Sequence, residues 1–91
     1  MDNKVSDLHK YYDHWNQGVK FVFAFDEVDP SLLHIFARHL VTPEIAIKTW
    51  WEGDKEVWNE KHRRYETSSN THTIYWFWLK KDKVVMVITC F

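Results

Sequence analysis

Two apolar runs near the C-terminus, residues 74–79 and 84–88, dominate the hydrophobic pattern of the chain. Both runs are rich in aromatic and β-branched side chains, which favour a β-strand. Neither run alternates apolar with polar residues, so we expect both faces of each strand to be buried. The charged stretch between them, residues 80–83, is typical of a hairpin loop. The pattern therefore predicts a β-hairpin in the middle of a sheet.

The N-terminal part of the chain has the spacing of an amphipathic helix. Ser6 is a candidate N-cap, apolar side chains follow at i, i+3, i+4 and i+7 up to Trp15, and Gly18 stands where a helix ends. We therefore predict a helix over residues 6–17. Residues 19–25 then place three phenylalanines on one face, which predicts a half-covered strand, at an edge of the sheet or paired with one neighbour.

The middle of the chain carries two helix-start signals. The Asp-Pro pair at 29–30 predicts a helix over residues 30–40, with Asp as N-cap and Pro at the first helical position. Thr-Pro-Glu at 42–44 repeats the signal for a helix that ends at Gly53. Residues 55–67 are polar with sparse apolar side chains, and predict one or two exposed strands.

The predicted order of elements is α-β-α-α-β-β-β in a single domain over residues 1–91. This order predicts an α+β fold with helices packed on one face of a mostly antiparallel sheet of three or four strands. Aromatic residues make up 18% of the chain, and their large buried areas compensate for a small core. Six tryptophans also indicate a surface for a partner, because tryptophan is enriched in interface hot spots.

Charge and cysteine content exclude several classes of protein. The net charge of −1 argues against binding nucleic acid by charge alone. A single cysteine, Cys90, excludes an internal disulfide, and we expect it to be a small buried hydrophobe rather than a nucleophile. The spacing of the six histidines fits no metal motif, so we expect neither a metal nor a cofactor. No signal peptide or membrane span is apparent, and we expect a soluble, cytoplasmic protein.

The segment at 61–66 has the side chains for RNA cleavage. Cleaving an RNA phosphodiester without a metal needs a base for the 2′-hydroxyl, an acid for the leaving oxygen and cations for the developing charge. On a strand, His62, Arg64 and Glu66 would share one face of this segment. Lys61, Arg63 and Tyr65 would share the other. The alternative is a solvated edge strand whose charges discourage association between sheets.

A second group of polar side chains lies on the helix predicted over residues 30–40. His34 and Arg38 are four residues apart, so they share a face of that helix, with His39 beside them. The alternative interpretation is that Arg38 pairs with an acidic residue and that His34 lies at the edge of the core.

Several short motifs resemble those of the BrnT-like toxins and the related DUF4258 proteins, which are small members of the wider RelE-type ribonuclease fold. They are Phe-Ala-Phe-Asp at 23–26, Arg-His at 38–39, Thr-Pro-Glu at 42–44, the strand with Arg64 and Glu66, and a closing hairpin. The resemblance covers about residues 21–91. It implies a metal-independent ribonuclease of a toxin–antitoxin system, with a cognate antitoxin as protein partner.

Under that hypothesis the catalytic candidates are Arg64, His62, Glu66 and His39, and the nucleic-acid-binding candidates are Lys61, Arg63, Tyr65 and Arg38. The cations would stabilise the phosphorane, the histidines or Glu66 would move protons, and Tyr65 would stack on a base. The chain departs from the family in two places, since Leu40 replaces the usual glycine and no arginine follows the last strand.

Two other hypotheses remain open from the sequence. One is a non-catalytic protein-binding module, such as an immunity protein, an antitoxin-like inhibitor or a phage-encoded inhibitor. Its expected anchors are Trp50, Trp51 and Trp58, which border a polar segment. The other is a homodimer in which the half-covered strand at 19–25 pairs across a two-fold axis.

Overall fold

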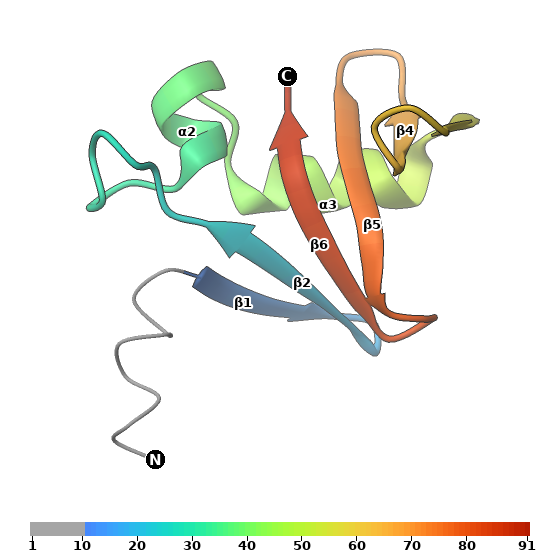
Figure 1. Ribbon diagram of the computed structural model, residues 1–91, viewed down its shortest axis with the longest axis horizontal. Helices are drawn as coiled ribbons and strands as arrows, with labels where there is room; N and C mark the ends of the chain where they lie inside the picture. Colours follow the sequence, from blue (N-terminus) through green and yellow to red (C-terminus); the bar gives the residue numbers. More distant parts are fainter. Residues whose placement is uncertain (1–10) are drawn as a thin grey trace.

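The computed structural model describes residues 11–91. A six-stranded sheet in the order β1-β2-β6-β5-β4-β3 forms the body of the structure, and two helices pack against it (Figure 1). The strands are β1 (Tyr11–Asn16), β2 (Val19–Ala24), β3 (Lys55–Asn59), β4 (Arg64–Ser68), β5 (Thr73–Lys80) and β6 (Val84–Cys90). The helices are α2 (His34–His39) and α3 (Pro43–Glu52).

One strand pairing makes the sheet mixed. β2 runs parallel to β6, with Phe23 beside Val87, whereas the other neighbouring strands are antiparallel. A parallel pair needs a crossover connection, and here the chain passes through α2, α3 and the strands β3, β4 and β5 before it returns as β6. The carboxyl ends of β2 and β6 consequently lie at the same edge of the sheet, beside α2 (Figure 1).

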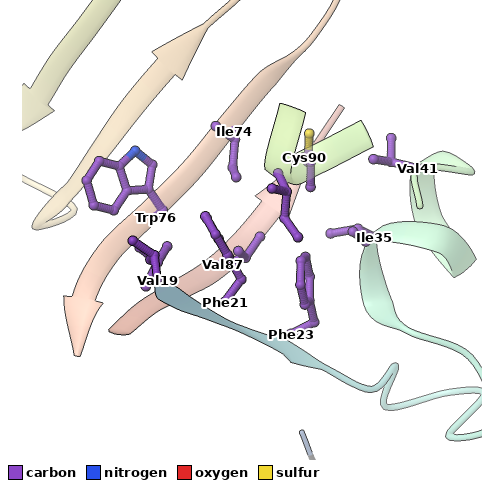
Figure 2. Packing of buried hydrophobic residues seen from close by; sticks show 12 residues of the cluster. Val19, Phe21, Phe23, Ile35, Val41, Ile74, Trp76, Val87 and Cys90 are labelled. Atoms are coloured by element: carbon purple, nitrogen blue, oxygen red, sulfur yellow. The ribbon is translucent and has the colours of Figure 1, made fainter. Parts of the chain in front are cut away.

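Both helices contribute to one core on one face of the sheet, and in Figure 1 α3 passes behind β5 and β6. Phe21 and Phe23 of β2 lie in this core with Ile35 of α2 (Figure 2). Ile47 of α3 belongs to the same cluster. Phe21 is fully buried, which stabilises the fold by about 1.5–3 kcal/mol relative to an exposed side chain. The core therefore unites β2 with the crossover that follows it.

Aromatic rings extend this core toward β4. The Trp50 ring lies edge-on to the rings of Phe21, Trp76 and Trp78, at centroid distances of 5.2, 5.3 and 5.8 Å. Tyr65 stacks on Trp76 at 4.7 Å. Such pairs each add about 0.5–1.5 kcal/mol beyond the area that they bury.

The opposite face of the sheet is covered by neither helix. Apolar side chains of β1, β2, β5 and β6 line a hollow of about 480 Å³ on this open face: Tyr11, Val22, Ala24, Phe77, Leu79, Met86, Val87 and Ile88. Leu79 is 55% exposed and Phe77 is only partly buried. The expectation that both faces of the terminal hairpin are buried is therefore wrong, although the hairpin itself is confirmed as β5 and β6.

The helix predicted over residues 6–17 is also wrong over the part that the structure describes. Residues 11–16 form β1, and residues 6–10 lie outside the described part of the chain. Gln17 and Gly18 both have positive φ, 51° and 82°, which suits a tight turn between antiparallel strands. This turn pairs β1 with β2. The aromatic residues whose spacing predicted one face of an amphipathic helix therefore lie on both faces of a strand.

Three further corrections concern β2, the sheet and α2. β2 pairs with both β1 and β6, so it is not at an edge, and the sheet has six strands rather than three or four. α2 begins at His34 and not at residue 30, because Leu33 forms a β-bridge with Phe25. The Asp-Pro pair at 29–30 begins a turn in which the Asp29 carboxylate accepts a hydrogen bond from the Ser31 hydroxyl at 2.6 Å.

The other predicted elements agree with the structure. Thr42 caps α3, its hydroxyl accepting the Ile45 N–H at 3.3 Å, and α3 ends before Gly53 as expected. Residues 55–67 contain β3 and most of β4, as expected in position. β3 is exposed as predicted, whereas β4 lies between β3 and β5 and is partly buried, so the expected exposure is wrong for β4. No helix within residues 11–91 is long and apolar enough to span a membrane.

Gly53 provides the first testable prediction. Its φ of −60° is open to any residue, so its role is spatial: an added Cβ would collide with the methyl group of Thr67 and lie 2.9 Å from the carbonyl oxygen of Thr49. Thr67 is buried and accepts a hydrogen bond from Trp76 Nε1 at 2.9 Å. We expect Gly53→Ala to lower the free energy of unfolding by about 1–3 kcal/mol in urea titrations.

A second substitution tests the cause. Thr67→Ser removes the obstructing methyl group and keeps the hydroxyl that accepts the Trp76 hydrogen bond. The double variant Gly53→Ala/Thr67→Ser should be less unstable than the sum of the two single variants predicts. Strict additivity would show that the collision is not the source of the effect.

Candidate functional site

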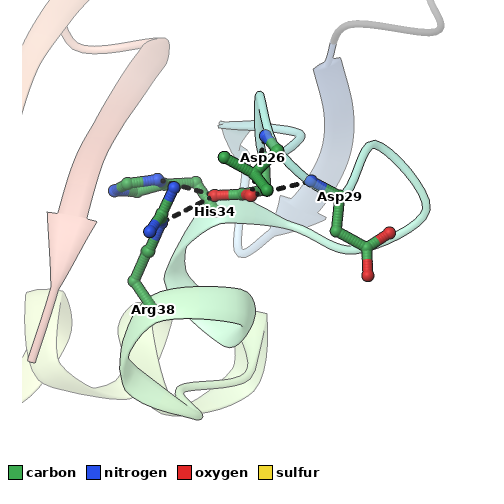
Figure 3. A network of polar contacts seen from close by, with 5 residues as sticks. Asp26, Asp29, His34 and Arg38 are labelled. Carbon is green, nitrogen blue, oxygen red and sulfur yellow. Dashed lines mark hydrogen bonds and ion pairs between the residues drawn. The ribbon is translucent and has the colours of Figure 1, made fainter.

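Asp26 is a buried carboxylate at the carboxyl end of β2, only 3% exposed. Its Oδ2 accepts the backbone N–H groups of Val28 and Asp29, both at 3.0 Å, and its Oδ1 accepts Arg38 Nε at 3.0 Å (Figure 3). The loop is closed by the Asp26 N–H, which donates to the Leu32 carbonyl at 2.8 Å. The carboxylate is thereby held in one orientation toward α2.

Helix α2 brings two cationic or titratable side chains to this carboxylate. His34 and Arg38 are one turn apart on the helix, so both reach Asp26. His34 Nδ1 lies 3.4 Å from Asp26 Oδ1, the same oxygen that Arg38 contacts (Figure 3). The side chains of His34 and Arg38 remain 37% and 48% exposed, which leaves their outer atoms open to a ligand.

His39 joins this group at the end of α2. Its ring lies edge-on to the His34 ring at a centroid distance of 6.4 Å, and 5.7 Å from the Phe91 ring. Phe91 is held by two backbone hydrogen bonds with Thr73, at 2.8 and 2.9 Å. Leu40 ends the helix with a φ of 56°, the left-handed conformation that favours glycine. The group of Asp26, His34, Arg38 and His39 is called the His–Arg cluster below.

A pocket of about 290 Å³ opens beside the His–Arg cluster. It is lined by Ala24, Phe25, Asp26, Glu27, His34, Arg38 and Ile88. Ala24 and Ile88 also line the apolar hollow of the open face, so the two depressions are contiguous. Glu27 is exposed and adds a negative charge to the wall of the pocket.

The environment of Asp26 keeps it ionised. The hydrogen bond from the Asp29 N–H is the largest cause that lowers the pKa of Asp26 below its usual value, and Arg38 and the Val28 N–H act in the same direction. Burial opposes them but does not prevail. At neutral pH the carboxylate is therefore a fixed negative charge that orients His34 and Arg38.

A second polar cluster lies on the open face, on β4 and its neighbours. Arg64 Nε donates to Glu66 Oε2 at 2.9 Å, and Asn59 Nδ2 donates to the same oxygen at 3.0 Å. The Arg64 guanidinium lies 3.8 Å above the Tyr75 ring. The hydrogen bond from Asn59, followed by that from Arg64, lowers the pKa of Glu66. Arg64 and Glu66 thus share a face, as predicted.

The rest of the 61–66 segment does not follow the predicted strand. Residues 60–63 form a turn with Arg63 at a φ of 53°, so the expected alternation of Lys61, His62 and Arg63 across a strand is wrong. These three side chains are exposed. Tyr65 is on the core side, where Trp58 and Trp76 lie against its ring. The ring of Tyr65 is thus occupied by packing within the protein.

The three tryptophans predicted as partner anchors differ in exposure. Trp50 is mostly enclosed in the aromatic core, whereas Trp51 and Trp58 are 42% and 41% exposed. Trp51 Nε1 donates to Asn16 at 2.9 Å, and Trp58 Nε1 donates to Glu60 at 2.8 Å. Two of the three therefore present a ring to solvent.

Aromatic contacts connect the two polar clusters. Tyr75, beneath Arg64, lies 5.2 Å from Phe91, which in turn lies beside His39. The candidates Arg64, Glu66 and His39 thus occupy neighbouring regions. His62 lies in the β3–β4 turn, and its charge is among the causes that lower the pKa of Glu66. The sequence pattern paired His34 with Arg38 but did not identify their acid, Asp26. One sequence feature could have identified Asp26 as this acid. Asp26 directly follows a strand and precedes the helix that carries His34 and Arg38.

Two further observations concern possible metal ligands and the cysteine. Within residues 11–91, no group of three or more His, Cys, Asp or Glu side chains is arranged to hold a metal ion. Cys90 is fully buried, and burial raises the pKa of its thiol to about 11, so it is a protonated thiol at neutral pH.

Comparisons with protein-family models, with curated proteins and with solved structures give no match for this chain.

Asp26 generates a prediction about pH. Because its pKa is lower in the folded state, ionised Asp26 contributes stability at neutral pH that is lost as the pH falls through the folded-state pKa, below about 4. We expect Asp26→Asn to lower the stability at pH 7 and to weaken the loss of stability on acidification. Urea unfolding at a series of pH values measures both effects.

The matched control is Asp82→Asn, which changes an exposed carboxylate in the β5–β6 turn. This variant should keep both the stability and its pH dependence. Glu66 also has a lowered pKa, so part of the acid effect should persist in Asp26→Asn and disappear in the double variant with Glu66→Gln. An unchanged acid profile in Asp26→Asn would contradict the proposed role of its charge.

Proposed function

We propose that this protein cleaves RNA without a metal ion and that the His–Arg cluster performs the reaction. The observation that carries the proposal is the buried Asp26 carboxylate, which holds His34 and Arg38 beside an open pocket. A buried acid that orients a histidine next to a cation is typical of sites that transfer protons and bind anions.

The position of His34 suits a general base. His34 Nδ1 lies 3.4 Å from Asp26 Oδ1, and in the proposed site Nδ1 carries the proton that faces this oxygen, which leaves Nε2 as an acceptor. In the proposed reaction His34 Nε2 takes the proton of the ribose 2′-hydroxyl, and the resulting oxygen attacks the adjacent phosphorus. Asp26 does not touch the substrate in this scheme, and its role is to position His34.

His39 and Arg38 supply the other two requirements. Protonated His39 donates its proton to the 5′-oxygen as the bond between that oxygen and phosphorus breaks, which yields a 2′,3′-cyclic phosphate and a 5′-hydroxyl end. Arg38 contacts Asp26 through Nε, and the N–H groups of its two outer nitrogens can bind the phosphoryl oxygens. The protons and electrons of the step then balance without a cofactor.

The cluster around Arg64 fits a supporting role better than a catalytic one. The Glu66 carboxylate is engaged by Arg64 and Asn59, and the lowered pKa makes it a weak base. The Arg64 guanidinium lies over the Tyr75 ring, which contacts Phe91, the neighbour of His39. In this position Arg64 can bind a phosphate of the same RNA strand. We therefore assign Arg64 to substrate binding.

The proposal predicts that the purified protein cleaves single-stranded RNA in excess EDTA and leaves cyclic phosphate ends. His34→Gln should lower kcat by about 100-fold or more, because general base catalysis contributes about 10²–10⁴. Arg38→Lys keeps the charge but loses the planar fork, and should cost about tenfold or more in kcat/KM. End-labelled RNA resolved on a gel, with chemical analysis of the new ends, measures these effects.

Three controls complete this experiment. His72→Gln alters a histidine outside both clusters and should leave cleavage unchanged. DNA of the same sequence lacks the 2′-hydroxyl and should stay intact. Glu27→Gln removes a negative charge from the pocket wall and should raise kcat/KM. Intact RNA with the native protein, or activity that His62→Gln abolishes and His34→Gln does not, would contradict the assignment.

Binding to a protein partner is a second candidate function, favoured by the edge strand β3. Val57 and Trp58 on this strand are 60% and 41% exposed, and β3 has one paired neighbour in the described sheet. An extended segment of a partner could pair with this edge and cover both side chains. We expect Trp58→Ala to abolish such binding in a pulldown and Trp51→Ala, which alters an equally exposed ring on α3, to preserve it.

A further inference from the structure

The hollow on the open face continues the pocket of the His–Arg cluster. Ala24 and Ile88 form part of both walls, so a ligand in the polar pocket can extend into the apolar hollow without leaving the surface. The hollow, at about 480 Å³, falls in the size range of small-molecule sites. Arg38 lines the polar pocket, which adjoins the hollow at Ala24 and Ile88. A ligand that fills both would have an anionic part beside Arg38 and an apolar part over the sheet.

The lining of the hollow fits a flat apolar group. Aliphatic side chains from β2, β5 and β6 form most of the surface, and Tyr11 and Phe77 add aromatic rings. Tyr11 is 44% exposed and Leu79 is 55% exposed, so both can close against a ligand that enters from solvent. A nucleobase has two apolar π-faces, so any of the bases can stack on such side chains.

We propose that the hollow is a base-binding subsite and that the substrate is single-stranded RNA. The base next to the cleaved phosphodiester lies in the hollow while its phosphate lies at Arg38. In a duplex the bases are stacked and paired, so none is free to enter, and the protein discriminates against double strands. Among residues 11–91, the side chains that line the hollow carry no charge, and their one polar group is the Tyr11 hydroxyl. We therefore expect the protein to prefer bases by stacking strength and not by base identity. This inference rests on the proposed ribonuclease function and specifies its substrate.

The test uses single-stranded RNA in which one nucleotide at a time is abasic. Removing the base next to the cleaved bond should lower kcat/KM by about tenfold or more, whereas abasic nucleotides further away should have no effect. Annealing the complementary strand should abolish cleavage. Equal cleavage of all abasic strands, or of the duplex, would overturn the inference.

Two adjacent tyrosines provide a matched pair of variants. Tyr11 pairs with Ala24 and lines the hollow, whereas Tyr12 pairs with Phe23 on the helix side of the sheet and is similarly exposed, at 41%. Tyr11→Ala should lower kcat/KM on intact RNA by about tenfold, and Tyr12→Ala should not change it. On the strand lacking the critical base, Tyr11→Ala should cause no further loss, because its partner is already missing.

A binding measurement separates this inference from the proposed function. Single-stranded 2′-O-methyl RNA has no free 2′-hydroxyl and cannot be cleaved by the proposed reaction, so its affinity reports on binding alone. If the native protein binds this strand and Tyr11→Ala weakens binding, the base subsite stands even where no RNA is cleaved. Binding that is absent or independent of Tyr11 would overturn the subsite and favour a protein partner for the open face.

Discussion

The parallel pairing of β2 with β6 is the constraint on which the rest of the structure depends. Antiparallel neighbours can be joined by a tight turn, but a parallel pair requires the chain to return to the starting edge of the sheet. Here α2 and α3 are part of that return, and they bury Phe21 and Phe23 of β2 in one core. The same pairing places the segments that follow both strands side by side, where Asp26 and Phe91 each approach α2.

The contacts of Asp26 stabilise this end of the sheet and also position two partly exposed polar side chains. A buried carboxylate is costly unless hydrogen bonds and an opposite charge compensate for its desolvation. Two backbone N–H groups and Arg38 provide this compensation, and His34 lies beside the same oxygen. Because Asp26 is satisfied from within, the outer atoms of His34 and Arg38 stay available. The structure thus keeps a charged group inside and its partners half exposed, which is the arrangement that the proposed chemistry needs.

The two faces of the sheet have different roles. The helix side is filled by interlocking aromatic and aliphatic side chains, whereas the open side carries an apolar hollow next to the polar pocket. An apolar hollow that neither helix covers, next to a polar pocket, is a candidate ligand site. The proposed RNA site joins these two features, since it places a base on the sheet and a phosphate at the cluster.

Local sequence determined those elements whose signals are complete over a few residues. The Thr42 cap and Gly53 delimit α3, and two β-rich runs around a charged loop form the hairpin of β5 and β6. The i, i+4 spacing alone placed His34 and Arg38 on one face of α2. Tertiary structure decided the remaining elements, because their local sequence fits a helix and a strand equally well. The aromatic spacing before Gly18 fits a helix as well as a strand, and pairing with β2 selected the strand. Likewise, the face of the hairpin left uncovered depends on β6 returning beside β2, a contact between residues more than sixty positions apart, which no local pattern encodes. The contact of Asp26 with Arg38 spans twelve positions and forms because the loop between β2 and α2 folds back on itself.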